Sequence, residues 1–134
     1  MEISHFNDLL AAARQQSEPQ RLLLMFARAS LPADASAEQR ARFKSGEAGE
    51  LEPLMCVDKD PATLADFDAL VAEAAVAGPA WALVFAAALS GQGGVPPAAS
   101  QVDAALQHMV ESLKSGKLSG LIPFDREGMA VQLD

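Results

Sequence analysis

The longest apolar run in the chain extends from Ala80 to Leu89 and ends abruptly in Ser-Gly-Gln-Gly-Gly at 90–94. An uninterrupted apolar run has no side for solvent, so it is typical of a strand that helices cover on both faces. Gly78-Pro79 before the run and the glycines after it limit it to the length of a strand. We therefore expect 80–89 to be the central strand of the fold.

Further helices and strands are expected on both sides of this run. Helical spacing of apolar residues predicts helices at 3–16, 36–45, 61–77 and between Ser100 and Gly116. Short apolar runs predict strands at 21–31, 54–57, 118–124 and 129–133. The expected N-caps are Ser4, Ser36, Asp60 and Ser100.

The order of these elements predicts the fold class. Strands that alternate with helices require crossover connections, and such connections favour a parallel sheet with helices on both faces. We expect a three-layer α/β/α sandwich with a mostly parallel sheet. A C-terminal antiparallel hairpin should close it, with Gly128 at a turn position of positive φ. All of residues 1–134 should form one α/β domain.

Composition excludes several classes of function. The net charge of −8 argues against nucleic-acid and membrane-surface partners, and no segment approaches the ~20 apolar residues of a membrane span. A lone cysteine, Cys56, forms no intrachain disulfide and suits a reducing compartment, so we expect a cytoplasmic protein. One cysteine and the isolated His5 and His108 predict neither a metal site nor a cofactor.

The loops after the strands could form a ligand crevice, because the carboxyl ends of parallel strands meet at one edge of a sheet. Closely spaced glycines let backbone amides approach an anion, although Pro96 and Pro97 remove two donors and a plain strand-to-helix turn explains the same glycines. A carboxylate and an ammonium at 58–59 could act as acid and base. The alternative is that Asp60 caps a helix, Asp58 makes a turn and Lys59 faces solvent. The candidate ligand-binding residues are Asp58, Lys59, Ser90, Gly91, Gln92, Gly93 and Gly94.

The sequence assigns no catalytic residue. Cys56 lies inside a strand run, where a cysteine is usually an inert core residue. His108 is expected on the surface of its helix, and the chain contains no G-x-S-x-G elbow. An enzymatic activity is therefore not favoured.

Several segments carry a resemblance to a known family: 6–10 (Phe-Asn-Asp-Leu-Leu), 18–23 (Glu-Pro-Gln-Arg-Leu-Leu), 54–59, 84–94 and 124–126. The chain resembles, over nearly its whole length, a family of small proteobacterial proteins that commonly bear the label "ribonucleotide reductase subunit alpha". A catalytic subunit of that enzyme needs several cysteines and usually a tyrosine relay, whereas this chain has one cysteine and no tyrosine. The resemblance therefore implies a small bacterial domain and transfers no catalytic residue.

Two functions from different classes remain open. Strands that contain Met and Phe, and a terminal hairpin with a free edge, favour a non-enzymatic module that binds a protein partner or a second copy of itself. The alternative is a binder of, or an enzyme for, an anionic or nucleotide-like small molecule. That ligand would occupy the crevice between Asp58-Lys59 and the 90–94 loop.

Overall fold

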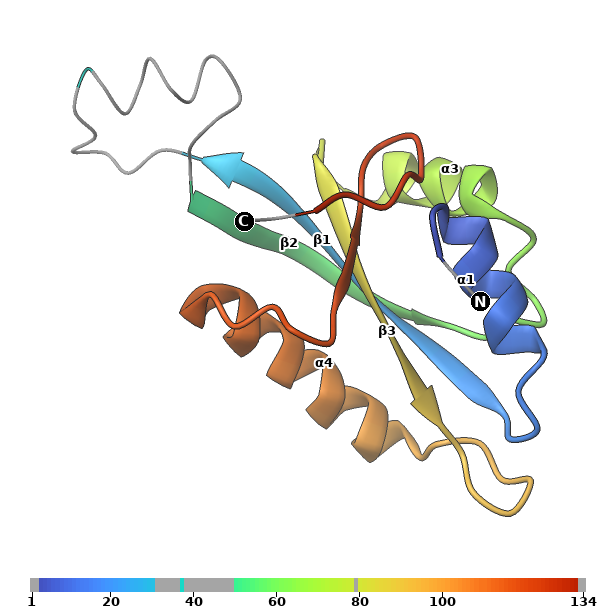
Figure 1. The fold of residues 1–134 in the computed structure, drawn as a ribbon. Coiled ribbons are helices and arrows are strands. Elements are labelled where there is room, and N and C mark those ends of the chain that lie inside the picture. Colours follow the sequence, from blue (N-terminus) through green and yellow to red (C-terminus); the bar gives the residue numbers. More distant parts are fainter. Residues whose placement is uncertain (1–2, 31–36, 38–49, 79, 133–134) are drawn as a thin grey trace.

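The computed structural model describes residues 3–30, 37, 50–78 and 80–132 (Figure 1). Three helices and four strands follow one another along these segments. They are α1 (Phe6–Arg14), β1 (Gln20–Ser30), β2 (Glu50–Lys59), α3 (Phe67–Ala77), β3 (Leu83–Ser90), α4 (Ala99–Ser115) and β4 (Ile122–Phe124). No helix in the described segments is long and apolar enough to cross a membrane.

β1 is the strand around which the sheet is built. It pairs with β2 from Leu22 opposite Lys59 to Ser30 opposite Glu50, and with β3 along most of its length. The sheet order is β2-β1-β3-β4, and every neighbouring pair is antiparallel. β2 and the short β4 are therefore the two outer strands of the described sheet.

The predicted parallel sheet is wrong. The crossover through α3 does leave β2 and β3 pointing in the same direction, as expected from the alternation of strands and helices. β1 lies between them, however, so each strand has only antiparallel neighbours. The expected helix at 36–45, which would have made the first crossover, lies outside the described residues apart from residue 37.

The two faces of the sheet carry separate apolar clusters. α1 and α3 cover one face and α4 covers the other (Figure 1). Alternate side chains of β1 divide between the clusters, with Leu22, Leu24 and Phe26 toward α1 and α3, and Leu23, Met25 and Ala27 toward α4. This double burial explains why β1 is apolar without interruption.

The strand expected at 80–89 is β3, which begins later, at Leu83. Trp81 precedes the strand and packs edge-on against Phe26 and Phe67, with ring centroids 5.0 and 6.4 Å away. The guanidinium of Arg126 lies 4.9 Å from the Trp81 ring centroid and donates to the Trp81 carbonyl. Trp81 therefore belongs to an aromatic cluster and not to the sheet.

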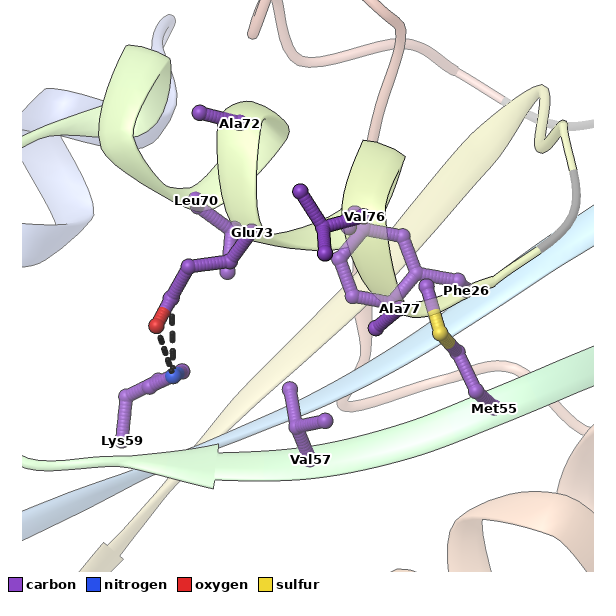
Figure 2. A pocket seen from close by; sticks show the side chains of 10 residues that line it. Phe26, Met55, Val57, Lys59, Leu70, Ala72, Glu73, Val76 and Ala77 are labelled. Atoms are coloured by element: carbon purple, nitrogen blue, oxygen red, sulfur yellow. Dashed lines mark hydrogen bonds and ion pairs between the residues drawn. The ribbon is translucent and has the colours of Figure 1, made fainter.

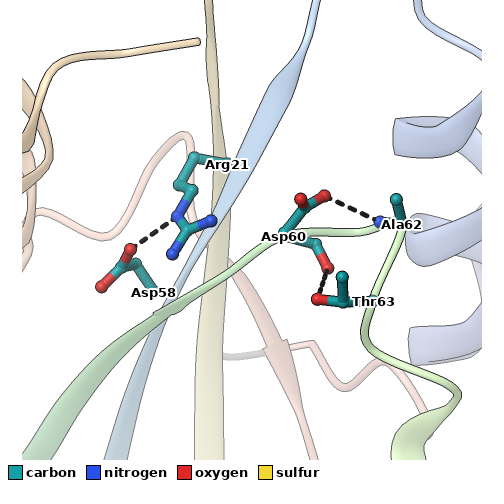
Figure 3. Close-up of polar contacts among 5 residues, drawn as sticks. All are labelled: Arg21, Asp58, Asp60, Ala62 and Thr63. Carbon is teal, nitrogen blue, oxygen red and sulfur yellow. Dashed lines mark hydrogen bonds and ion pairs between the residues drawn. The ribbon is translucent and has the colours of Figure 1, made fainter.

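α3 begins six residues later than predicted. Asp60 and Pro61 form a turn, in which Oδ1 of Asp60 accepts from the amide of Ala62 (Figure 3). Asp66 is the N-cap of the helix. The guanidinium of Arg14 donates to the carbonyls of residues 61, 64 and 65. These contacts from α1 hold the segment before α3 outside the helix, and no local pattern could have indicated them.

The amino and carboxyl ends of the described chain are joined through His5, which is the N-cap of α1 in place of the expected Ser4. Nδ1 of His5 accepts from the amide of Asn7 at 3.0 Å, and Nε2 donates to the carbonyl of Glu127 at 3.0 Å. The amide of Phe6 donates to the carbonyl of Gly128.

Gly128 has φ +86°, as expected for the turn of the C-terminal hairpin. Within the described residues, which end at 132, the expected hairpin consists of β4 and a single bridge from Phe124 to Ala130.

Replacing Gly128 tests this junction. An added Cβ would lie 2.6 Å from Nε2 of His5 and 2.9 Å from a ring carbon of Phe67, on a backbone already in the left-handed region. We expect Gly128→Ala to lower the free energy of unfolding by about 2–4 kcal/mol. Urea denaturation followed by the fluorescence of Trp81, the single tryptophan, measures it.

The matched control is Gly120→Ala. Gly120 has φ +89°, but nothing lies within 4 Å of an added Cβ. In this variant only backbone strain is introduced, so the free energy of unfolding should fall by only about 1–2 kcal/mol. Equal losses in the two variants would contradict the close packing of Gly128 against His5.

Asp8 stabilises the first turn of α1. Its Oδ2 accepts from the amide and hydroxyl of Ser4 and from the amide of His5, at 3.0–3.2 Å. The backbone donor of Ser4, followed by that of His5, favours the charged carboxylate. These bonds hold the pKa of Asp8 below its ordinary value.

The lowered pKa of Asp8 predicts how stability depends on pH. A carboxyl whose pKa is lower in the folded state stabilises the protein at pH values above the carboxyl's unfolded-state pKa of about 4. This stabilisation is lost as the pH falls through the folded-state pKa. We expect Asp8→Asn to melt at a lower temperature than the wild type at neutral pH. The difference between the two melting temperatures should disappear as the pH falls below about 4. A difference that does not depend on pH would contradict this account.

Candidate functional site

The structure brings the predicted site residues to one end of the sheet but not into one site. Because β2 and β3 point the same way, Lys59 and Ser90 both lie where β1 begins. Lys59 is opposite Leu22, and Ser90 is opposite Gln20. β1 therefore runs between the 58–59 pair and the 90–94 loop.

Asp58 and Lys59 also point to opposite faces of the sheet. Oδ2 of Asp58 accepts from Nε of Arg21 at 2.6 Å (Figure 3), whereas Nζ of Lys59 lies 2.8 Å from Oε2 of Glu73 on α3 (Figure 2). Each charge has its own partner of opposite sign. The two side chains therefore do not act together on one ligand as an acid and a base.

The glycine loop forms a tight hairpin turn. Gln92 and Val95 exchange two backbone hydrogen bonds of 3.0 Å, and Gly93 and Gly94 between them have φ +61° and +79°. Two successive positive φ values are those of a type I′ turn, which explains the need for glycine.

The amides of this loop donate largely within the protein. The amide of Gly91 donates to the carbonyl of Pro19 at 2.7 Å, and that of Gly94 donates to a carboxylate oxygen of Glu18 at 3.2 Å. The hydroxyl of Ser90 lies 3.0 Å from Nε2 of Gln20. The turn geometry thus accounts for the glycines, and the anion site remains a prediction.

The remaining candidate side chains have structural surroundings. Cys56 is half-buried on the α4 face of β2, and burial raises the pKa of its thiol. His5 is the N-cap described above, and His108 is exposed on α4. Within the described segments, no three His, Cys, Asp or Glu side chains are placed to hold a metal ion.

Sequence reasoning missed an apolar groove of about 550 Å³ between β2 and α3 (Figure 2). Phe26 of β1 and Met55 and Val57 of β2 form one side of the groove. The other side consists of α3 residues: Leu70, Ala72, Glu73, Ala74, Val76 and Ala77. Lys59, paired with Glu73, is the one basic residue in the lining.

The groove is open because β2 is at the edge of the sheet. Phe26 is buried, Met55 and Val57 are half-buried, and Val76 is 91% exposed. Isolated surface valines are ordinary, but one that borders an open apolar groove extends a continuous apolar surface. Such surfaces are typical of sites that bind other molecules.

A β-bulge shapes the β2 side of this groove. Met55 lies opposite Phe26 but Pro53 lies opposite Ala27, so Leu54 is an extra residue in β2. Both Leu54 and Met55 pack against the cluster on the α3 face. Beyond the bulge, Glu52 forms an ion pair of 3.1 Å with Arg28.

One signal in the sequence could have indicated this edge. Proline lacks the amide hydrogen that a central strand needs, so Pro53 beside the run Leu54–Val57 is typical of an outer strand. The prediction of a short apolar strand at 54–57 took no account of this proline. The outward position of Val76 had no equivalent signal, because the sequence of α3 is apolar around most of its circumference.

The chain matches no protein-family model, no curated protein and no solved structure. Among the hollows in the described segments, the β2–α3 groove combines apolar walls with an adjoining outer strand.

The type I′ turn at Gly93 gives a direct test of the loop geometry. A β-branched side chain is strained at φ +61°, so Gly93→Val should lower the free energy of unfolding by about 1–2 kcal/mol. Asparagine tolerates this conformation, and Gly93→Asn should stay within about 0.5 kcal/mol of the wild type. Urea denaturation followed by Trp81 fluorescence measures both. If Gly93→Val left the free energy of unfolding unchanged, the turn would not require a positive φ at this position.

Proposed function

We propose that the protein is a non-enzymatic binding module that takes up an apolar segment of another protein in the β2–α3 groove. The observation that carries this proposal is an open apolar groove of about 550 Å³ beside an outer strand. Burial of the exposed apolar surface by a partner releases about 25 cal/mol for each Å² removed from water.

The chemistry of the groove supports a protein segment better than a small polar ligand. Small-molecule sites usually have several polar groups that converge on the ligand. Here the charged side chains in the lining, Lys59 and Glu73, are already paired with each other. The pairing of Asp58 with Arg21 and the internal bonds of the 90–94 loop give the anionic-ligand alternative less support.

The proposal includes the cellular setting expected from the sequence. A lone, half-buried cysteine suits the reducing cytoplasm of a bacterium. Membership in the small proteobacterial family that the chain resembles is part of the same proposal. A second copy of the chain is the less favoured partner, because each copy carries a net charge of −8 and would repel the other.

A pair of exposed valines provides a matched test. Val76 borders the groove and is 91% exposed. Val95 lies in the hairpin turn that follows β3 and is 64% exposed. Glutamate at either position should leave the melting temperature unchanged, because neither side chain is in the core. In Val76→Glu, however, a carboxylate would have to be desolvated against the bound apolar segment.

The probe is a phage-displayed library of random decapeptides, selected on the full wild-type chain. Enriched peptides should bind Val76→Glu at least about tenfold more weakly by fluorescence anisotropy, which corresponds to about 1.4 kcal/mol. Binding to Val95→Glu should stay within about twofold. A selection without enrichment, or peptides that bind both variants equally, would refute the proposed function.

A further inference from the structure

We infer that the occupant of the groove adds to the outer edge of β2 as an extra strand, with apolar side chains at alternate positions and a basic side chain beside Asp58. This inference rests on the proposed function and specifies the chemistry of its partner. Three features of β2 carry it: an edge with which no described strand pairs, the alternation of its side chains and the position of its charges.

The edge available for pairing is short. Within the described residues, β2 pairs with β1 alone, so the backbone groups on its other side point away from the sheet. Pro53 offers no amide hydrogen, and the bulge at Leu54 disrupts regular pairing. The usable edge therefore runs from Met55 to Lys59, about 16 Å of strand at 3.3 Å per residue.

The groove side of this edge selects apolar side chains. Met55 and Val57 point toward α3, and in an added strand the side chains opposite them would lie about 5 Å away on the same face. These side chains would lie against Met55 and Val57, which line the β2 side of the groove (Figure 2). The occupant therefore needs apolar residues two positions apart.

The opposite side of the edge selects a positive charge. Asp58 is oriented away from the groove, and one of its oxygens accepts from Arg21 on the inner strand β1 (Figure 3). Its side chain is 34% exposed, and its second oxygen can accept from a cation on an added strand. A Lys or Arg opposite Asp58 forms a favourable cross-strand pair, whereas an acidic residue there is repelled.

The wider charge distribution favours the same partner. Lys59 is the one basic residue in β2 and α3 together. Their acidic residues are Glu50, Glu52, Asp58, Asp68 and Glu73. With a net charge of −8 on the whole chain, a basic segment is attracted to this region at long range. A second copy of the chain would bring the same negative charge.

The test uses short labelled peptides whose core reads the same in either strand direction. The core Lys-Val-Ser-Val-Lys places valines opposite Met55 and Val57 and a lysine opposite Asp58, whether the added strand is parallel or antiparallel. One comparison peptide has glutamate in place of lysine, and one has the same side chains with N-methylated backbone amides. A third carries the valines and lysines on a stapled helix. Fluorescence anisotropy with the full chain gives each Kd.

The basic extended peptide should bind most tightly. The acidic and N-methylated peptides should bind at least about tenfold more weakly, because one is repelled and the other cannot donate strand hydrogen bonds. Asp58→Asn should weaken binding of the basic peptide by about threefold. It should not weaken binding of a peptide that has glutamine in place of both lysines. Asp103→Asn removes an equal charge from an exposed position on α4 and should leave both Kd values unchanged.

The outcomes separate this inference from the proposed function. Tighter binding of the stapled helix or of the N-methylated peptide, still lost in Val76→Glu, would overturn strand addition and leave the groove as the binding site. Equal binding of the acidic and basic peptides would overturn the charge assignment. Failure of every peptide to bind in a Val76-dependent manner would overturn the proposed function as well. A dimer in light scattering that Val76→Glu abolishes would show that a second copy occupies the groove.

Discussion

The burial of β1 on both faces is the constraint on which the rest of the structure depends. The side chains from Leu22 to Ala27 are at most 3% exposed, and burying each large apolar one contributes about 1.5–3 kcal/mol. One helix layer can cover only alternate residues of a strand. α1 and α3 must therefore lie on one face and α4 on the other. Because β1 is also paired along both edges, β2 is left at the outside of the sheet.

The sequence indicated which segments are buried better than it indicated which segments are neighbours. β1 lies within one residue of its expected start and end, α4 ends at Gly116 as predicted, and Gly128 has the expected positive φ. The direction of the sheet was wrong for a physical reason. A strand buried on both faces is apolar throughout, whatever the direction of its neighbours. No residue pattern revealed that β1 lies between the crossover-connected β2 and β3.

The groove was not predictable because it depends on the lateral position of α3. That position is set by aromatic contacts between segments far apart in the sequence. Phe67 at the start of α3 packs against Phe6 of α1, with ring centroids 5.4 Å apart, and against His5 and Trp81. These contacts hold α3 over the inner strands, so the α3 face of β2 stays partly uncovered. Local periodicity reports neither contact partners nor lateral position; only Pro53 gave a local signal that β2 is an outer strand.

An open strand edge usually invites uncontrolled pairing between copies, and proteins protect such edges with prolines, bulges and charges. In β2 these protections lie on both sides of the stretch Met55–Val57. Glu52, Pro53 and the bulge at Leu54 precede it, and Asp58 and Lys59 follow it. The apolar stretch between them stays accessible beside the groove. Under the proposed function, this arrangement admits one short strand and blocks extension at both ends, while the net charge of −8 disfavours a second copy. The same features that protect the chain from self-pairing thereby favour a short, basic partner.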